Sequence, residues 1–325
     1  MRHDPKLDGL RAIAAVVVVA FHSWVPGFGS GFLGVDVFFV LSGYLITKLL
    51  IEERLNMGKI SYNNFFVRRF WRLYPAFLLL LFIYAVVGPV LYPEYELAKH
   101  YKDILISGFY LSDYAVAYNA LPSVLNHTWS LAVEVHFYLL WPFILNLILR
   151  MPRKNLFFVL FIMWVLATLW RLYAFFLLKH GWTEIYHGFG THCSGLIFGA
   201  LIATLKPIKK PFFSNIGFLI LLIAAVLFKW KEAETVFFAF TFSEVGSALL
   251  ILSPPAWLGN KVLVFTGKIS YGLYLWHYPI VRVMRNFEAS WEGTFFVSLV
   301  FGAFLAITSY YMLEKPLLKY RENKQ

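Results

Sequence analysis

Long apolar runs constrain this sequence more than any other feature. A bilayer core needs about 20 mostly apolar residues per helix. Hydrophobic residues make up 60% of the chain and charged residues only 14%, which excludes a soluble or disordered chain. The sequence therefore predicts an all-α polytopic membrane protein with about ten transmembrane helices. The predicted spans are Leu7–Trp24, Phe32–Leu50, Leu73–Tyr92, Thr128–Leu149, Leu156–Leu178, Thr191–Leu205, Phe212–Lys229, Val236–Leu252, Val262–Val283 and Thr294–Leu313.

An eleventh apolar segment, Ile104–Tyr118, is short and interrupted by polar residues. These properties favour an interfacial or re-entrant segment over a full span. If it does not span, most of the 29 lysines and arginines lie on the cytoplasmic side, as positive-inside topology requires. We therefore expect cytoplasmic N- and C-termini. The net charge of +11 then reflects topology, and we expect no nucleic-acid partner.

The organisation of the chain indicates one unit. Its basic N-terminus and first apolar run are similar to a signal peptide, but no small-residue cleavage site follows, so we expect a retained helix. The lone Cys193 excludes a disulfide scaffold. Because no repeat or long linker divides the chain, we expect a single membrane-embedded domain over residues 1–325, without an appended soluble domain.

Ionisable residues inside apolar spans are costly in a membrane and are therefore functional candidates. Arg11 and His22 share a face of the first predicted helix at opposite depths. Asp36 begins the second span at a depth similar to that of His22, where a carboxylate could fix the imidazole tautomer. The alternatives are lipid contacts for Arg11 and an interfacial His22, and a helix-dipole role for Asp36.

A third polar group comprises His127 and Glu134, seven positions apart on nearly one helix face. In the predicted topology both lie towards the outer leaflet, with His22 and Asp36. A buried glutamate near a neutral histidine is typical of general acid–base catalysis. A metal site is not expected, since zinc-type spacing is absent and these two residues are too few ligands.

Arginines gather at the opposite membrane face. Arg68, Arg69 and Arg72 precede Tyr74 and Pro75 at the start of the third span. Guanidinium groups suit phosphate because they can bind it bidentately. A plain positive-inside anchor is the alternative.

Two more buried polar residues lack an assigned task. His277 lies two positions before Pro279, which can kink the helix, so His277 either lines a cavity or is a hydrogen-bonded core residue. Arg171, inside the fifth span, needs a polar lining or a carboxylate partner.

Together these segments resemble the integral-membrane acyltransferase-3 family of bacterial O-acyltransferases. The resemblance implies transfer of an acyl group, usually acetyl, from cytoplasmic acyl-CoA to a hydroxyl, often on a surface or exported carbohydrate. It also implies a catalytic His22, required arginines at Arg11 and before Tyr74, and a place in the bacterial inner membrane. The chain looks like a stand-alone member, without the extracytoplasmic hydrolase-like domain of some relatives. The matching segments are Leu7–Ala12, the Arg11–His22 spacing, Gly34–Thr47, Arg69–Pro75, Trp129–Glu134 and Tyr271–His277.

These observations give a site hypothesis. Arg11, Arg69 and Arg72 bind the phosphates of acetyl-CoA, the donor substrate. His22 is the general base, and Asp36 or Glu134 orients it as a further catalytic residue. A covalent acyl-enzyme on His22 or Ser42 is a second route. The predicted partners are membrane lipids, acyl-CoA and a carbohydrate or glycolipid acceptor.

Two other functions stay open on the sequence. One is acylation of a small cytoplasmic hydroxyl compound such as an antibiotic. The other is a proton-coupled transporter or polysaccharide exporter, which would use the same intramembrane charges. A transporter would be expected to show a repeat between its halves, and the sequence has none.

Overall fold

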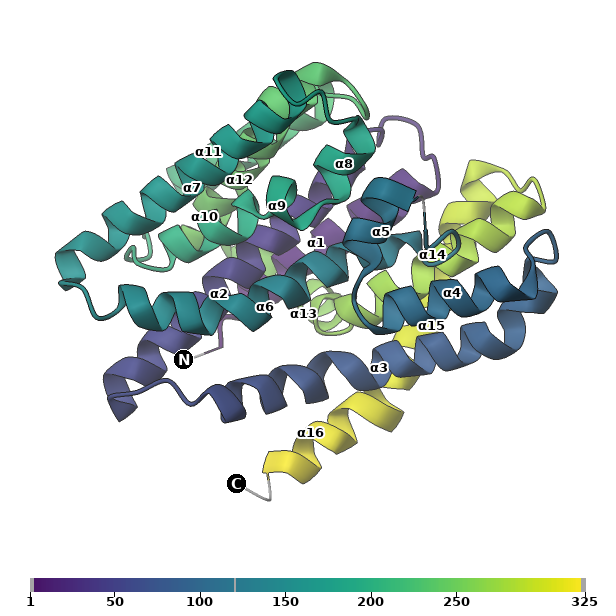
Figure 1. Ribbon diagram of the computed structural model, residues 1–325, viewed down its shortest axis with the longest axis horizontal. Helices are drawn as coiled ribbons and strands as arrows, with labels where there is room; N and C mark the ends of the chain where they lie inside the picture. The colour runs from purple at the N-terminus through teal and green to yellow at the C-terminus, as the bar shows by residue number, and fades with distance from the viewer. Residues whose placement is uncertain (1–2, 120, 323–325) are drawn as a thin grey trace.

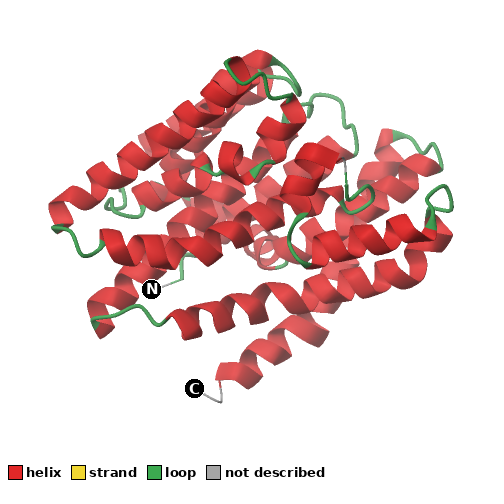
Figure 2. Ribbon diagram, in the orientation of Figure 1, coloured by secondary structure: helices red, strands yellow, loops and turns green. Residues whose placement is uncertain are grey.

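The computed structural model describes residues 3–119 and 121–322, and these residues form helices joined by loops. No strand occurs in this part of the chain (Figure 2). The α-helices in chain order are α1 (Pro5–His22), α2 (Gly34–Met57), α3 (Tyr62–Leu91), α4 (Leu97–Gly108), α5 (Ser112–Asn119), α6 (Trp129–Ile148), α7 (Arg153–Phe176), α8 (Trp182–His187), α9 (Phe189–His192), α10 (Ser194–Ile202), α11 (Pro211–Leu227), α12 (Phe240–Leu252), α13 (Lys261–Lys268), α14 (Ser270–Asn286), α15 (Trp291–Ser309) and α16 (Lys315–Glu322).

Membrane-spanning helices dominate the fold. Six helical segments of the described chain are long and apolar enough to cross a bilayer. Each overlaps one predicted span, so the prediction of an all-α, multi-pass membrane protein is confirmed. These segments are Gly31–Met57, Tyr62–Leu91, Asn126–Ile148, Lys154–Phe176, Thr235–Leu252 and Trp291–Leu317.

The other four predicted spans correspond to shorter, charged or interrupted helices. Helix α1 has 18 residues but carries charged side chains in its first turns, and α11 has 17 residues. The span predicted at Thr191–Leu205 is divided between α9 and α10, with a break at Cys193. The span predicted at Val262–Val283 is divided between α13 and α14, with a break at Ile269.

The doubtful eleventh segment is also broken. Helix α4 ends at Gly108, the chain turns through Phe109 and Leu111, and α5 then runs for only 8 residues. Neither piece is long enough to cross a bilayer core by itself, because a helix rises about 1.5 Å per residue. The segment is therefore not one continuous transmembrane helix, in line with its polar interruptions.

Helices α1 and α2 occupy the middle of the molecule (Figure 1). Helices α7, α10, α11 and α12 gather on one side of this pair, and α3, α4, α14 and α15 on the other. Small residues permit the closest contacts: a Cβ atom at Gly43 of α2 would overlap the carbonyl oxygen of Leu196 in α10. Such close backbone approach is typical of helix packing in membranes.

The N-terminal end of α1 is fixed locally. The Asp4 side chain accepts a hydrogen bond from the backbone N–H of Lys6 at 3.0 Å, and Pro5 occupies the first helical position. A Cβ atom at Gly267, near the end of α13, would overlap the carbonyl oxygen of Asp8. The α13–α14 break thus lies against the start of α1, and α14 then runs beside α1. This arrangement brings His277 of α14 to the far end of α1, where His22 lies.

Candidate active site

A cavity of about 620 Å³ lies between α1, α2, α3, α6 and the α13–α14 break. We call it the arginine cavity, because Arg11, Arg68, Arg69 and Arg72 all line it, together with Lys268. The structure therefore brings together all three residues predicted to bind the donor, although Arg11 is more than fifty residues from the others in sequence.

The arginines of this cavity differ in their partners. Arg11 contacts Asp8 at 3.4 Å, within its own helix. The Arg69 guanidinium lies over the rings of Phe65 and Tyr138, at 5.7 and 5.9 Å from their centroids, and its Nε is buried without a hydrogen-bond partner in the described structure. No carboxylate among the described residues lies within 4 Å of the Arg69 or Arg72 guanidinium. A ligand oxyanion would satisfy this unpaired donor, so the residues present fit a phosphate-bearing molecule.

Glu134 lies in the arginine cavity and has other partners than His22. Its Oε1 accepts hydrogen bonds from the Ser42 hydroxyl and, at 2.8 Å, from the Tyr138 hydroxyl. The expectation that Glu134 orients His22 is therefore wrong. Glu134 lies about 7.5 Å along the axis of α6 from its first residue, Trp129, whereas His127 lies in the short turn that precedes this helix. A catalytic role for Glu134 stays a prediction, now with Ser42 as the group it contacts.

A second cavity, of about 300 Å³, contains His22 and is lined largely by aromatic rings. We call it the histidine cavity, because His22, His127 and His187 line it. Arg285 and Asn126 add polar groups to its wall. Its aromatic lining consists of Phe21, Trp24, Phe32, Trp129, Tyr186, Trp230, Tyr274 and Tyr278.

His22 is paired with another histidine. Its Nδ1 lies 3.0 Å from Nε2 of His277, and Nδ1 of His277 lies 2.7 Å from the carbonyl oxygen of Tyr274. A carbonyl can only accept, so Nδ1 of His277 carries a hydrogen. When each ring holds one proton, Nε2 of His277 accepts from Nδ1–H of His22. The unprotonated Nε2 of His22 is then left as a base, with no hydrogen bond to a described residue.

The second histidine of the predicted outer group has a different role. Nε2 of His127 donates to the carbonyl oxygen of Leu275 at 3.0 Å, and its ring stacks on that of Tyr278 at 5.1 Å. His127 thus ties the start of α6 to α14 beside the histidine pair. It packs near His277, with ring centroids 5.9 Å apart, and has no hydrogen bond to Glu134 among the described residues.

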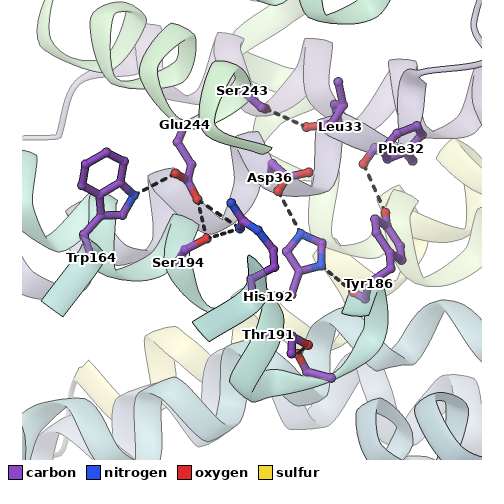
Figure 3. A network of polar contacts seen from close by, with 12 residues as sticks. Phe32, Leu33, Asp36, Trp164, Tyr186, Thr191, His192, Ser194, Ser243 and Glu244 are labelled. Carbon is purple, nitrogen blue, oxygen red and sulfur yellow. Dashed lines mark hydrogen bonds and ion pairs between the residues drawn. The ribbon is translucent and has the colours of Figure 1, made fainter. Parts of the chain in front are cut away.

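Asp36 is buried next to a histidine other than His22. Its Oδ1 lies 2.9 Å from Nε2 of His192 (Figure 3). The other ring nitrogen of His192 bonds to the carbonyl oxygen of Tyr186. The expectation that Asp36 orients His22 is therefore wrong, because Asp36 points from α2 towards the α9–α10 break. Since both neighbours of His192 are oxygens, the pair shares a buried proton. The catalytic assignment of Asp36 stays a prediction.

The Asp36–His192 pair packs against the aromatic wall of the histidine cavity. The His192 ring stacks on that of Trp129, with centroids 5.5 Å apart at 20°, and Trp129 and Tyr186 both line the cavity. Asp36 therefore does not line the cavity itself. It bonds to His192, which packs against the aromatic rings that do. The sequence signal for His192, next to the lone Cys193, was too weak to indicate this partner.

Arg171 has the partners that its burial requires. Its Nη1 donates to the Ser194 hydroxyl at 2.7 Å and lies 4.0 Å from Oε1 of Glu244. Glu244 also accepts from Ser194 at 2.5 Å and from the Trp164 indole at 2.8 Å (Figure 3). The predicted carboxylate partner of Arg171 is therefore Glu244, on α12. This network joins α7, α10 and α12, away from both cavities.

The two cavities meet at two side chains. Val35 and Tyr274 line both of them. The Tyr274 hydroxyl donates to the carbonyl oxygen of His127 at 2.9 Å and lies 2.6 Å from the Ser130 hydroxyl. The described residues contain no group of three or more His, Cys, Asp and Glu placed to hold a metal ion. The arrangement thus provides a basic nitrogen in one cavity, unpaired arginines in the other, and a thin wall between them.

The sequence of this chain is similar to those of known acyltransferases. Residues 4–313 match a family described as an acyltransferase domain. A Staphylococcus aureus (strain COL) protein that carries O-acetyltransferase in its name is 31% identical over 98% of this chain. O-acetyltransferase OatA of Staphylococcus aureus is 30% identical over 98% of this chain. The chain spans 58% of the length of each of these relatives. No solved structure matches it.

Proposed function

Because the chain belongs to the acyltransferase family that its residues 4–313 match, we propose that it is a membrane O-acyltransferase. In this proposal it transfers an acyl group, acetyl in the simplest case, from acyl-CoA to a hydroxyl of a surface or exported carbohydrate. The O-acetyltransferase names of its relatives support the acyl group and the hydroxyl acceptor.

The observation that carries the proposal is the histidine pair. The carbonyl oxygen of Tyr274 fixes the proton on His277, and His277 fixes the proton on His22. His22 lines the histidine cavity, and its Nε2 has no hydrogen bond to a described residue. A second residue that holds the base in one tautomer is a recurrent feature of histidine catalysis. His22 is therefore the general base, and His277 replaces Asp36 and Glu134 as the residue that orients it.

The transfer proceeds directly in this proposal. The acceptor oxygen attacks the thioester carbon while its proton moves to Nε2 of His22. A carbon–oxygen bond forms, the carbon–sulfur bond breaks, and the sulfur of CoA leaves with the bonding electrons. The proton then passes from His22 to the departing thiolate, so that an ester and free CoA result and His22 is neutral again.

The arginine cavity supplies the donor site. Arg69 and Arg72 bear charges unpaired by described carboxylates, and Arg11 lines the same space. Basic groups on the cytoplasmic side of an inner membrane would meet acyl-CoA where it is made, which requires cytoplasmic termini, as the positive-inside pattern predicts. Once bound there, the nucleotide phosphates lie at the arginines and the thioester extends towards Val35 and Tyr274.

The histidine cavity supplies the acceptor site. A space of about 300 Å³, walled by aromatic rings with a few polar groups, suits one sugar ring at a time. Trp24, at the edge of this cavity, is an exposed tryptophan that packs under the Arg285 guanidinium at 3.6 Å. Arg285 also donates to the carbonyl oxygen of His22, which fixes the end of α1 beside the acceptor.

Labelled acetyl-CoA tests the function. Membranes containing the wild-type protein should transfer label into the polysaccharide fraction, and His22→Ala should lower the rate about 10²–10⁴-fold, the range of general base catalysis. Equal incorporation with His22→Ala would remove the catalytic assignment. Label found only in small soluble compounds would instead support an antibiotic-type acceptor. Transfer of an unlabelled solute without any acylation would support a transporter.

A further inference from the structure

Building on the proposed donor and acceptor sites, we propose that Val35 and Tyr274 form a partition that limits the length of the transferred acyl group. No side chain other than these two lines both cavities within the described parts of the chain. Both are nearly inaccessible to solvent, at 4% and 7% exposure. The reacting carbon and the acceptor oxygen must therefore meet beside them.

The lining of the arginine cavity is charged near the arginines and mostly apolar near Val35. One face of α2 lines it with Val35, Phe38, Ser42, Leu45 and Leu49. This stripe is about 21 Å long at 1.5 Å per residue. Gly31 packs against Val17 and Phe21, whereas Gly34 packs against Ala14 and Val18, so α1 and α2 run in opposite directions. Arg11 therefore lies further towards the Leu49 end of α2 than His22 does. A donor whose charged part binds the arginines therefore presents its far end to the partition.

The partition has mostly apolar neighbours on the donor side. Phe38, Phe39 and Leu131 line the arginine cavity with Val35 and Tyr274, and the Tyr274 ring packs against that of Phe38 with centroids 6.4 Å apart. Ser130 adds one hydroxyl to the same lining and contacts the Tyr274 hydroxyl. These apolar neighbours suit the short hydrocarbon of an acyl group.

Tyr274 is held firmly in place. Its hydroxyl donates to the carbonyl oxygen of His127 and contacts the Ser130 hydroxyl at 2.6 Å, so the ring is tied to the start of α6. Its carbonyl oxygen accepts from Nδ1 of His277 at 2.7 Å. The residue that closes the donor cavity therefore also fixes the tautomer of the histidine pair. A ring that swung away to admit a long chain would lose two hydrogen bonds.

The distance required between the reacting atoms allows this wall to limit the length of the acyl group. The acceptor oxygen, held by His22, must approach the thioester carbon to within about 3–3.5 Å. With the carbonyl carbon at the partition, each further methylene has to occupy space that Val35 or Tyr274 fills. Discrimination of one methylene in an apolar pocket amounts to about 10–200-fold. Acetyl fits, and longer chains are excluded progressively.

Chain-length profiles test the partition. The rates of transfer from labelled acetyl-, propionyl- and butyryl-CoA are measured with wild-type membranes and with Val35→Ala, which removes two methyl groups from the wall. We expect the butyryl-to-acetyl ratio to rise at least about 10-fold. Val35→Ile, which enlarges the wall, should lower the propionyl-to-acetyl ratio. A ratio is insensitive to partial loss of folded protein, so it separates selectivity from stability.

The matched control is Val37→Ala. Val37 lies two residues further along α2, is similarly buried at 6% exposure, and lines neither cavity. Its profile should equal that of the wild type. Unchanged ratios in both Val35 variants, or an equal change in Val37→Ala, would overturn the partition while leaving the proposed function intact. A wild-type protein that transfers no acyl group from any of the three thioesters would overturn the proposed donor, and the partition with it.

Discussion

The two cavities differ in what their polar groups are free to do. In the arginine cavity, Glu134 is occupied by Ser42 and Tyr138, while Arg69 keeps an unpartnered donor. In the histidine cavity, the hydrogen bonds of the histidine pair leave Nε2 of His22 as a basic nitrogen, and Nδ1 of His127 also has no hydrogen-bond partner among the described residues. The first arrangement suits binding of an anion and the second suits proton transfer. Donor binding and proton transfer are thus assigned to two cavities that Val35 and Tyr274 separate.

The sharpest test of this division is His277→Phe. The ring keeps its volume, but His22 loses the acceptor that fixes its tautomer. We expect turnover to fall about 100-fold, at the lower end of general base effects, with the KM for acetyl-CoA unchanged in steady-state assays. His277→Gln, whose side-chain oxygen can accept from His22, should recover part of the rate. A change in KM alone would place His277 in binding instead.

Arg69→Ala tests the other cavity. Loss of a charge-assisted hydrogen bond of about 1.5–3 kcal/mol should raise the KM for acetyl-CoA about 10–100-fold and leave turnover at saturation unchanged. Arg54→Ala is the control, since Arg54 bonds to Asn146 and does not line the cavity. If Arg69→Ala lowered turnover and left KM alone, the phosphate-binding role would be wrong.

Asp36→Asn tests the contribution of the hydrogen bond in the Asp36–His192 pair, which packs against the wall of the histidine cavity. We expect the free energy of unfolding to fall by about 1–3 kcal/mol, because the buried bond to His192 is weakened. Activity should fall together with stability. In denaturant titrations of the detergent-solubilised protein, Asp36→Asn and His192→Gln should be non-additive, since they remove the same interaction. Loss of activity with unchanged stability would restore Asp36 as a directly catalytic residue.

Ser42→Ala should have the smallest effect. Ser42 donates to Glu134, the arrangement of a nucleophile beside a base, so a covalent route would need it. With direct transfer, we expect turnover to change by less than about 10-fold, whereas removal of an essential nucleophile costs orders of magnitude more. Rapid-quench trapping of labelled protein gives the independent readout. An acyl-enzyme that disappears in Ser42→Ala would move the chemistry into the arginine cavity.

Much of the fold and part of the site follow from local sequence. Apolar runs predicted the helices, since the bilayer requires internally bonded backbone of fixed length. Helical periodicity placed Arg69 and Arg72 on one face, and both line one cavity. The breaks at Cys193 and Ile269 were missed, because apolar composition continues through both and hydropathy does not report where a helix stops.

The partners of the buried polar groups were decided only by the tertiary structure. The sequence identified His22, Asp36, Glu134 and Arg171 as ionisable residues within apolar spans, where an unpaired polar group is costly. The sequence did not determine which residues would be their partners. His22 meets His277, 255 positions away, and Asp36 meets His192, 156 positions away. Helix period and membrane cost act within one segment, whereas the facing of two helices depends on how all of them pack.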